Sequence, residues 1–316
     1  MIEVEELRKH FGATRAVDGV SFRVGRGEII GLLGPNGSGK TTIMRILTGF
    51  FPPTSGRARI GGLDVETHSL EVRQKVGYMP ENTVLYPDMP VQRFLAFCAE
   101  VKGLRGRAAR DRVERMIEDV GLAEVRRKEI GKCSKGYRQR VGIAQALIHE
   151  PEVLILDEPT VGLDPQQVVE IRELIRALRG RTTILLSTHI LPEVSVTCDR
   201  VIIMHRGHVL AEDTAEGLHK RVEGVYQTLM RIQGPTEEVL RVVRSVPAVT
   251  QAEERPSPND SAVRVLVTSS EDESVRRELT RKVVDNGWSL LEMSPVALTL
   301  EDLFVRLVRS PEERGN

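Results

Sequence analysis

The chain is short of cysteine and carries no net charge. Its three cysteines, Cys98, Cys133 and Cys198, are too few and too widely spaced for a disulfide framework or a zinc site. We therefore expect reduced thiols, as in cytosolic proteins. The 45 basic and 45 acidic residues cancel. This balance argues against a general binder of nucleic acid or of anionic lipid, because such a binder needs an excess of positive charge.

Long apolar runs are missing as well. Apolar runs such as Val153–Leu156, Ile184–Leu186 and Val201–Met204 fall far short of the roughly 18 residues that span a bilayer. The first residues lack the basic start and the apolar core of a signal peptide, so we expect none. A path across a membrane would then have to come from another chain.

What the first two-thirds of the chain does have is a series of Gly-rich turns between short apolar runs. Ile29–Leu33, Val153–Asp157 and Thr183–Ser187 have the composition of buried strands, each with a helical pattern nearby. This alternation predicts an α/β unit with a mainly parallel core sheet. Residues 88–150 are instead charged and helical in pattern, which predicts a helical subdomain inserted into that unit.

The last hundred residues follow a different order. Strand patterns alternate with two helical stripes, and Gly287 stands where a helix would end. The resulting order, β-α-β-β-α-β, predicts a small α+β domain of the split βαβ or ferredoxin-like plan, followed by a further helix from Thr299. We therefore expect two domains, 1–220 and 221–316. The predicted strands are Tyr226–Ile232, Val249–Glu253, Val263–Val267 and Trp288–Met293, and the predicted helices span Val239–Val246 and Val275–Val284.

A phosphate-binding motif is the strongest chemical signal. Gly34-Pro-Asn-Gly-Ser-Gly-Lys-Thr41 matches G-x-x-x-x-G-K-S/T between a predicted strand and a predicted helix, Thr41–Leu47. The glycines let backbone N–H groups turn inward around an anion, and the helix N-terminus adds partial positive charge. Lys40 would reach the β- and γ-phosphates and Thr41 would bind Mg²⁺. The candidate nucleotide ligands here are Gly34, Asn36, Gly37, Ser38, Gly39, Lys40, Thr41 and Thr42.

Two acids end the next predicted strand. Asp157 follows Leu154-Ile-Leu and so stands at the carboxyl end, where ligands of α/β sheets collect. We expect Asp157 to hold Mg²⁺, mostly through water, and Glu158 to orient and polarise the attacking water.

The order of the remaining motifs resembles ABC-type ATPases over roughly residues 2–218. Ser134-Lys-Gly136-Tyr-Arg-Gln139 resembles the family's signature segment, which usually reads L-S-G-G-Q. The resemblance implies that Ser134 and Gly136 contact the γ-phosphate. It also assigns Asp164 to the D-loop, His189 to the switch position, Glu81 to the Q-loop, where it can ligate Mg²⁺, and Phe11 to a stack on adenine.

Three residues depart from the family pattern. Cys133 replaces a leucine, which we interpret as an apolar filler, and Lys135 replaces a glycine of the signature. Glu81 stands in place of glutamine, and its extra negative charge near the triphosphate is expected to alter affinity or metal dependence. Such variants resemble the ATPase subunits of ABC-2-type exporters, including drug-efflux and gliding-motility-associated systems.

The resemblance also implies partners. Two nucleotide domains, here a homodimer, would pair head to tail around ATP, and a separate transmembrane permease would hold the chain at the cytoplasmic face of the membrane. The permease would dock near Glu81 and Thr83–Met89, with Leu85 and Tyr86 as apolar contacts. The last domain would add dimer contacts, pack on the ATPase domain, or sense a ligand.

Two alternatives stay open at this point. An import ATPase would have identical chemistry and a different membrane partner. A soluble ABC ATPase acting on ribosomes or DNA is disfavoured by the neutral charge, by the single nucleotide domain and by the 52 residues between Glu81 and Ser134, which leave no room for a long coiled coil.

Overall fold

The computed structural model describes residues 1–214, 217, 226–255 and 262–296. The chain divides into two compact units, Met1–Ala215 and Glu216–Asn316. The expected boundary at 220/221 lies outside the described residues and stays a prediction, as does the helix expected from Thr299. Among the described helices, none is long and apolar enough to cross a membrane.

The first unit contains a six-stranded sheet in the order β10-β9-β3-β8-β7-β6. Five of its strands run parallel, and β10 is antiparallel to its neighbour β9. The central strands β3, β7 and β8 are wholly buried, as their apolar sequences predicted. The strands span Ile29–Leu33 (β3), Val76–Met79 (β6), Val153–Asp157 (β7), Thr183–Thr188 (β8), Arg200–His205 (β9) and His208–Asp213 (β10).

A second, antiparallel sheet has the order β2-β1-β4-β5 and shares an apolar core with the parallel sheet. Its strands span Ile2–Phe11 (β1), Thr14–Val24 (β2), Ser55–Ile60 (β4) and Leu63–Asp64 (β5). Helices α1, α2, α6 and α7 accompany the sheets and span Lys40–Leu47, Ser69–Lys75, Pro165–Ala177 and Leu191–Thr197.

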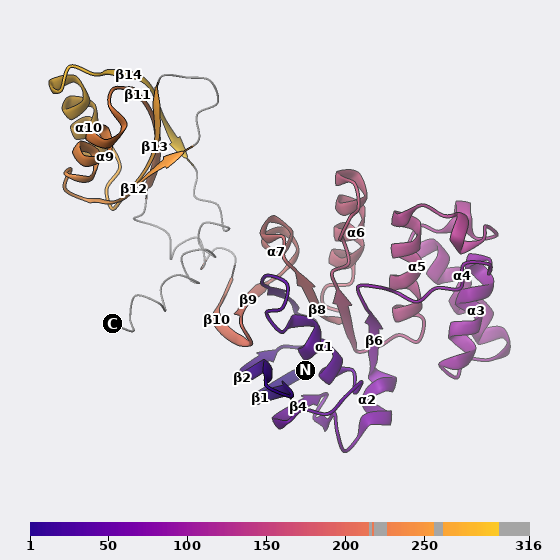
Figure 1. The fold of residues 1–316 in the computed structure, drawn as a ribbon. Helices are drawn as coiled ribbons and strands as arrows, with labels where there is room; N and C mark the ends of the chain where they lie inside the picture. Colours follow the sequence, from indigo (N-terminus) through magenta and orange to yellow (C-terminus); the bar gives the residue numbers. More distant parts are fainter. Residues whose placement is uncertain (215–216, 218–225, 256–261, 297–316) are drawn as a thin grey trace. The chain divides into compact units, whose positions relative to one another are not determined.

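The predicted helical subdomain is present. Figure 1 shows α3, α4 and α5 grouped together beyond β6, at one end of the first unit. The helices span Val91–Val101 (α3), Gly106–Asp119 (α4) and Lys135–Leu147 (α5), with short 3₁₀ turns at Ala123–Val125 and Ile130–Lys132. The charged sequence of α4 forms a helix because its apolar residues share one buried stripe, which includes Val113, Met116 and Ile117.

The second unit has the predicted element order. Two helices lie on one face of a four-stranded antiparallel sheet with the order β12-β13-β11-β14 (Figure 1). A compact valine-rich core fills the space between sheet and helices. The elements are β11 (Tyr226–Gln233), α9 (Thr236–Arg244), β12 (Val249–Arg255), β13 (Val263–Ser269), α10 (Glu273–Asp285) and β14 (Ser289–Val296). The name ferredoxin-like stays a prediction for this unit.

Candidate functional site

The phosphate loop joins β3 to α1 in a conformation that depends on glycine. Gly37 and Gly39 have φ angles of 80° and 106°, which side-chain-bearing residues rarely adopt. A Cβ on Gly39 would lie 2.5 Å from the carbonyl oxygen of Ala16. The loop therefore closes against β2, and its N–H groups come together at the start of α1, where a helix favours anions.

A cavity of about 510 Å³ opens over this loop. Ten of the predicted residues line it: Phe11, Asn36, Gly37, Ser38, Gly39, Lys40, Thr41, Thr42, Glu81 and Glu158. Gly34 does not line the cavity, but its carbonyl oxygen accepts a hydrogen bond from Lys40 Nζ at 2.6 Å. The structure thus brings most of the predicted nucleotide residues to one place.

Lys40 is buried among acids. Its Nζ lies 3.6 Å from Glu158 Oε1 and also donates to the carbonyl oxygen of Pro35. Burial lowers the pKa of the Lys40 amine, and the negative charges of Glu158, Asp157 and Glu81 act in the opposite direction. The cavity therefore holds a cation that is poorly hydrated and close to where phosphates would lie.

Asp157 lies at the end of β7 and meets Thr41 across the loop. The Thr41 hydroxyl donates to Asp157 Oδ1 at 3.2 Å, and the Ser187 hydroxyl donates to the same oxygen at 2.6 Å. The other oxygen, Asp157 Oδ2, is buried without a hydrogen-bond partner. A hydroxyl and an unpartnered carboxylate oxygen suit Mg²⁺, which prefers oxygen ligands and uses few protein groups beside phosphates.

Within the described residues, no group of three or more His, Cys, Asp or Glu side chains could hold a metal ion. A cation at Thr41 and Asp157 would therefore depend on the phosphates of the nucleotide for its remaining ligands.

Glu158 has an unusual backbone. Its φ is 50°, a left-handed value that is uncommon outside glycine and that often marks active sites. Its backbone N–H donates to the Ser187 hydroxyl at 3.0 Å, and its Oε2 lies 2.9 Å from His189 Nδ1. His189 does not line the cavity itself, so it reaches the site through Glu158.

Phe11 lies at the rim of the cavity with about half of its surface exposed. Phe51 packs edge-on against its ring, at 5.5 Å between centroids, and Lys9 Nζ lies 5.3 Å from its centre. These contacts fix the ring while leaving it accessible for stacking.

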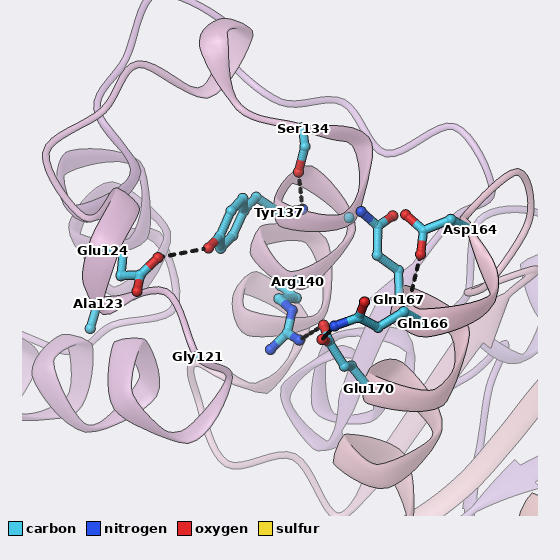
Figure 2. Close-up of a pocket in the computed structure, with 11 residues that line it drawn as sticks. Gly121, Ala123, Glu124, Ser134, Tyr137, Arg140, Asp164, Gln166, Gln167 and Glu170 are labelled. Carbon is cyan, nitrogen blue, oxygen red and sulfur yellow. Dashed lines mark hydrogen bonds and ion pairs between the residues drawn. The ribbon is translucent and has the colours of Figure 1, made fainter.

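The signature residues lie elsewhere. Ser134, Gly136 and Asp164 line a second cavity of about 530 Å³, which shares no residue with the first. Figure 2 shows its walls, with Ser134 accepting from the backbone N–H of Tyr137 at the start of α5 and Asp164 accepting from that of Gln167 at the start of α6. Both side chains are N-caps of their helices.

The structure explains the two residues that depart from the family's signature, Cys133 and Lys135. Cys133 is buried, consistent with an apolar filler. The Lys135 ammonium lies over Gly162 of the D-loop, 2.2 Å from where a Cβ would be, so no larger residue fits there without moving the lysine. Gly136 is covered in the same way by the Gln167 side chain, because a Cβ on Gly136 would lie 2.6 Å from Gln167 Cδ.

Four lining residues were missed in the sequence: Thr14, Arg15, Ala16 and Arg206. The first three follow Phe11 through a tight hairpin, so their closeness in sequence could have pointed to them. Arg206 comes from the β9–β10 turn, which reaches the phosphate loop because Gly207 N–H donates to the Ser38 carbonyl oxygen at 3.1 Å. No local pattern signals that contact.

Comparison with known proteins agrees with this geometry. A family model described as ABC transporter matches residues 17–161, and one described as AAA domain, putative AbiEii toxin, Type IV TA system matches residues 133–196. The linearmycin resistance ATP-binding protein LnrL of Bacillus subtilis is 32% identical, over 97% of this chain and 98% of its own length. The daunorubicin resistance ATP-binding protein DrrA2 of Streptomyces coeruleorubidus is 34% identical, over 97% of this chain and 94% of its own.

The chain belongs to the ABC transporter ATP-binding proteins. It is therefore an ABC-type ATPase, as the motifs predicted. A solved ATP binding subunit of an ABC transporter is 31% identical and has a TM-score of 0.63, covering 70% of this chain and 92% of its own. MJ0796, a bacterial ABC transporter cassette solved as a dimer, is 25% identical with a TM-score of 0.62, covering 68% of this chain and 99% of its own. These matches confirm the predicted nucleotide-binding fold of the ABC ATP-binding protein.

Proposed function

We propose that the chain is the ATPase subunit of an ABC-2-type exporter of antibiotic-like compounds and that it works as a homodimer. Relatives that match nearly the whole chain carry the names linearmycin resistance, daunorubicin resistance and, in Bacillus licheniformis, bacitracin transport ATP-binding protein. These names favour export over import. ATP hydrolysis by this chain then powers transport through a permease, which is a separate chain.

The observation that carries the dimer is the separation of the two half-sites. Lys40 and its neighbours surround one cavity, and Ser134 and Gly136 surround another. If both halves act on one ATP, the second half must come from another copy of the chain. A C₂ pair would complete two equivalent sites at once. The dimeric relative MJ0796 supports this arrangement.

ATP then joins the two copies. Lys40, Asn36 and the loop glycines would hold the phosphates, and Phe11 would stack on the adenine. Ser134 and Gly136 of the second copy would contact the γ-phosphate, with Asp164 beside them. Because ADP lacks that phosphate, hydrolysis removes contacts that exist only in the closed dimer, and the open state becomes favoured.

Glu158 is the base in this proposal and His189 its partner. The carboxylate lies between Lys40 and His189, at 3.6 Å and 2.9 Å, where it can take a proton from a water next to the γ-phosphate. Thr41, Asp157 and Glu81 would hold Mg²⁺, which supplies charge neutralisation for the triphosphate when bound.

A surface next to Glu81 is proposed to bind the permease. Val84, Tyr86 and Phe97 all expose apolar side chains there, and Tyr86 packs against Phe94 and Phe97 of α3. The absence of a membrane-crossing helix among the described residues fits a peripheral position at the cytoplasmic face, reached through the permease.

The test is Glu158→Gln. Loss of a general base lowers turnover by about 10²- to 10⁴-fold, while the phosphate contacts remain. The variant should therefore accumulate as an ATP-bound dimer, which analytical ultracentrifugation detects. Glu118→Gln, on the exposed side of α4, is the matched control and should behave as wild type. Wild-type turnover in Glu158→Gln, or a monomer with ATP bound, contradicts the proposal.

A further inference from the structure

One buried acid in the first unit has no role in the chemistry above. Glu193 on α7 is 8% exposed. Its Oε2 accepts a hydrogen bond from the Thr160 hydroxyl at 2.6 Å and another from the Thr188 hydroxyl at 3.1 Å. Both threonines are themselves buried. A buried carboxylate is tolerated in a fold when its hydrogen bonds are satisfied, and here both hydrogen bonds come from threonines of other elements.

The two threonines flank the proposed catalytic pair. Thr160 lies two residues after Glu158, and Thr188 directly precedes His189. Thr188 Oγ1 also accepts from the backbone N–H of Ile190 at 3.0 Å, which fixes the chain on the far side of His189. A single oxygen atom of Glu193 therefore connects the loop after β7 to Thr188, the last residue of β8.

This connection is one of three that the consecutive residues 187–189 make to residues 157–160. Ser187 bonds to Asp157 and to the backbone of Glu158, Thr188 reaches Thr160 through Glu193, and His189 bonds to the Glu158 carboxylate. The first and third connections use groups of the site itself. The middle one uses only side chains outside it, and so it can be altered without touching a residue that meets the nucleotide.

We propose that Glu193 is a positioning residue, which holds the Glu158 loop and the His189 loop as one body. Glu158 has a left-handed φ of 50°, a conformation that persists only where the surroundings fix it. Anchoring Thr160 fixes the chain just after Glu158, and anchoring Thr188 fixes the chain just before His189. The inference rests on the proposed roles of Glu158 and His189.

Two substitutions of Glu193 separate hydrogen bonding from volume. Glu193→Gln keeps an acceptor oxygen that can take both hydroxyl protons, while Glu193→Leu fills similar space and removes the acceptor of both protons. Because a displacement of about 1 Å in a catalytic group can cost roughly a hundredfold, we expect kcat of Glu193→Leu to fall by about that factor. KM for ATP should stay unchanged, since the phosphate loop is intact, and Glu193→Gln should restore most of kcat.

Thr197→Val is the matched control for burial on the same helix. Thr197 is, like Glu193, a buried residue of α7, but its hydroxyl has no hydrogen-bond partner, so turnover should not change. If Glu193→Leu fails to fold, Thr188→Val and Thr188→Ser decide instead: the valine should lose kcat and the serine should keep it.

These kinetic measurements distinguish failure of the positioning role from failure of the proposed function. Wild-type kcat in Glu193→Leu or, failing that variant, in Thr188→Val overturns the positioning role, as does a Glu193→Gln that is no better than the leucine. A KM for ATP that rises as much as kcat falls also overturns it. If Glu158→Gln abolishes turnover while these variants do not, only the positioning role fails; if Glu158→Gln turns over normally, the proposed function itself fails.

Discussion

The cavity over the phosphate loop and the second cavity, lined by Ser134, Gly136 and Asp164, differ in how deeply their polar residues are buried. Lys40, Asp157 and Glu158 are each at most 6% exposed. Asp157 ends the parallel strand β7 and Glu158 follows it, while Lys40 begins α1 after the phosphate loop. Ser134 and Asp164 are exposed helix caps. One half of the proposed site is thus buried and held by surrounding hydrogen bonds, while the other consists of polar side chains on an exposed surface. A nucleotide should bind the first half unaided and need the second only for closure.

The two halves are nevertheless connected within one chain. Gln139 of α5 is buried, and its Nε2 donates to the carbonyl oxygen of Pro159 at 2.7 Å. Pro159 directly follows Glu158. This hydrogen bond connects α5, which Ser134 caps, to the loop that carries Glu158, the proposed general base.

The largest effect is expected in the buried half. Lys40→Ala removes a charged donor to the phosphates, a loss of about 3 kcal/mol or roughly a hundredfold in Kd for ATP. The titration should be done on dilute protein, where no dimer forms. Lys128→Ala, an exposed lysine, serves as control. Unchanged ATP affinity in Lys40→Ala would contradict the phosphate-loop assignment.

A smaller and different effect is expected in the exposed half. Ser134→Asp keeps a good N-cap for α5 but places a negative charge where the γ-phosphate of the partner's nucleotide would lie. We expect ATP affinity of the dilute protein to be unchanged and maximal turnover to fall by roughly ten- to a hundredfold, since a charge-assisted hydrogen bond contributes about 1.5–3 kcal/mol.

Ser134→Ala should fall between Ser134→Asp and wild type in turnover, because it removes the donor without adding repulsion. Its melting temperature should be lower than that of Ser134→Asp, since alanine is a poor cap. A drop in the ATP affinity of the dilute Ser134→Asp protein equal to that of Lys40→Ala would erase the distinction between the halves.

This contrast also explains what the sequence could and could not predict. The strands at Ile29–Leu33 and Val153–Asp157 were predicted with their observed limits, because wholly apolar runs ended by glycine or acid have few alternatives. Trp288 was placed in a strand that in fact begins at Ser289, a shift of one residue where the Gly287 turn ends. The phosphate loop was equally clear, since its chemistry lies in consecutive residues.

What the sequence did not reveal are contacts made by chain segments far apart. Arg206 enters the cavity because a turn after β9 docks on the phosphate loop, and Ser187 bridges two acids because β8 lies beside β7. Glu193 has no motif around it. Such residues are defined by sheet order, and sheet order is a property of the whole fold.

The smallest predicted effect concerns His149, which anchors the far end of the signature helix to the core sheet. It follows α5, and its Nε2 donates to the carbonyl oxygen of Val76 in β6 at 3.1 Å. Its Nδ1 is buried without a partner, and Lys102 lies close by. Burial, and then the charge of Lys102, lowers the pKa of His149 to about 4, from an ordinary value near 6.5.

Because the folded pKa is the lower one, the unfolded chain binds more protons between pH 6.5 and 4, and stability is lost as the pH falls through that window. The ring is partly exposed, so solvent screening reduces the effect, to about 1 kcal/mol between pH 7 and pH 5. His149→Gln keeps a donor for Val76 and cannot titrate, so its unfolding free energy in urea should fall less over the same range. The transition is best followed by circular dichroism, with fluorescence of the single tryptophan, Trp288, reporting the second unit as an internal reference. Equal pH slopes for wild type and His149→Gln would mean that this anchor of the signature half does not respond to acid.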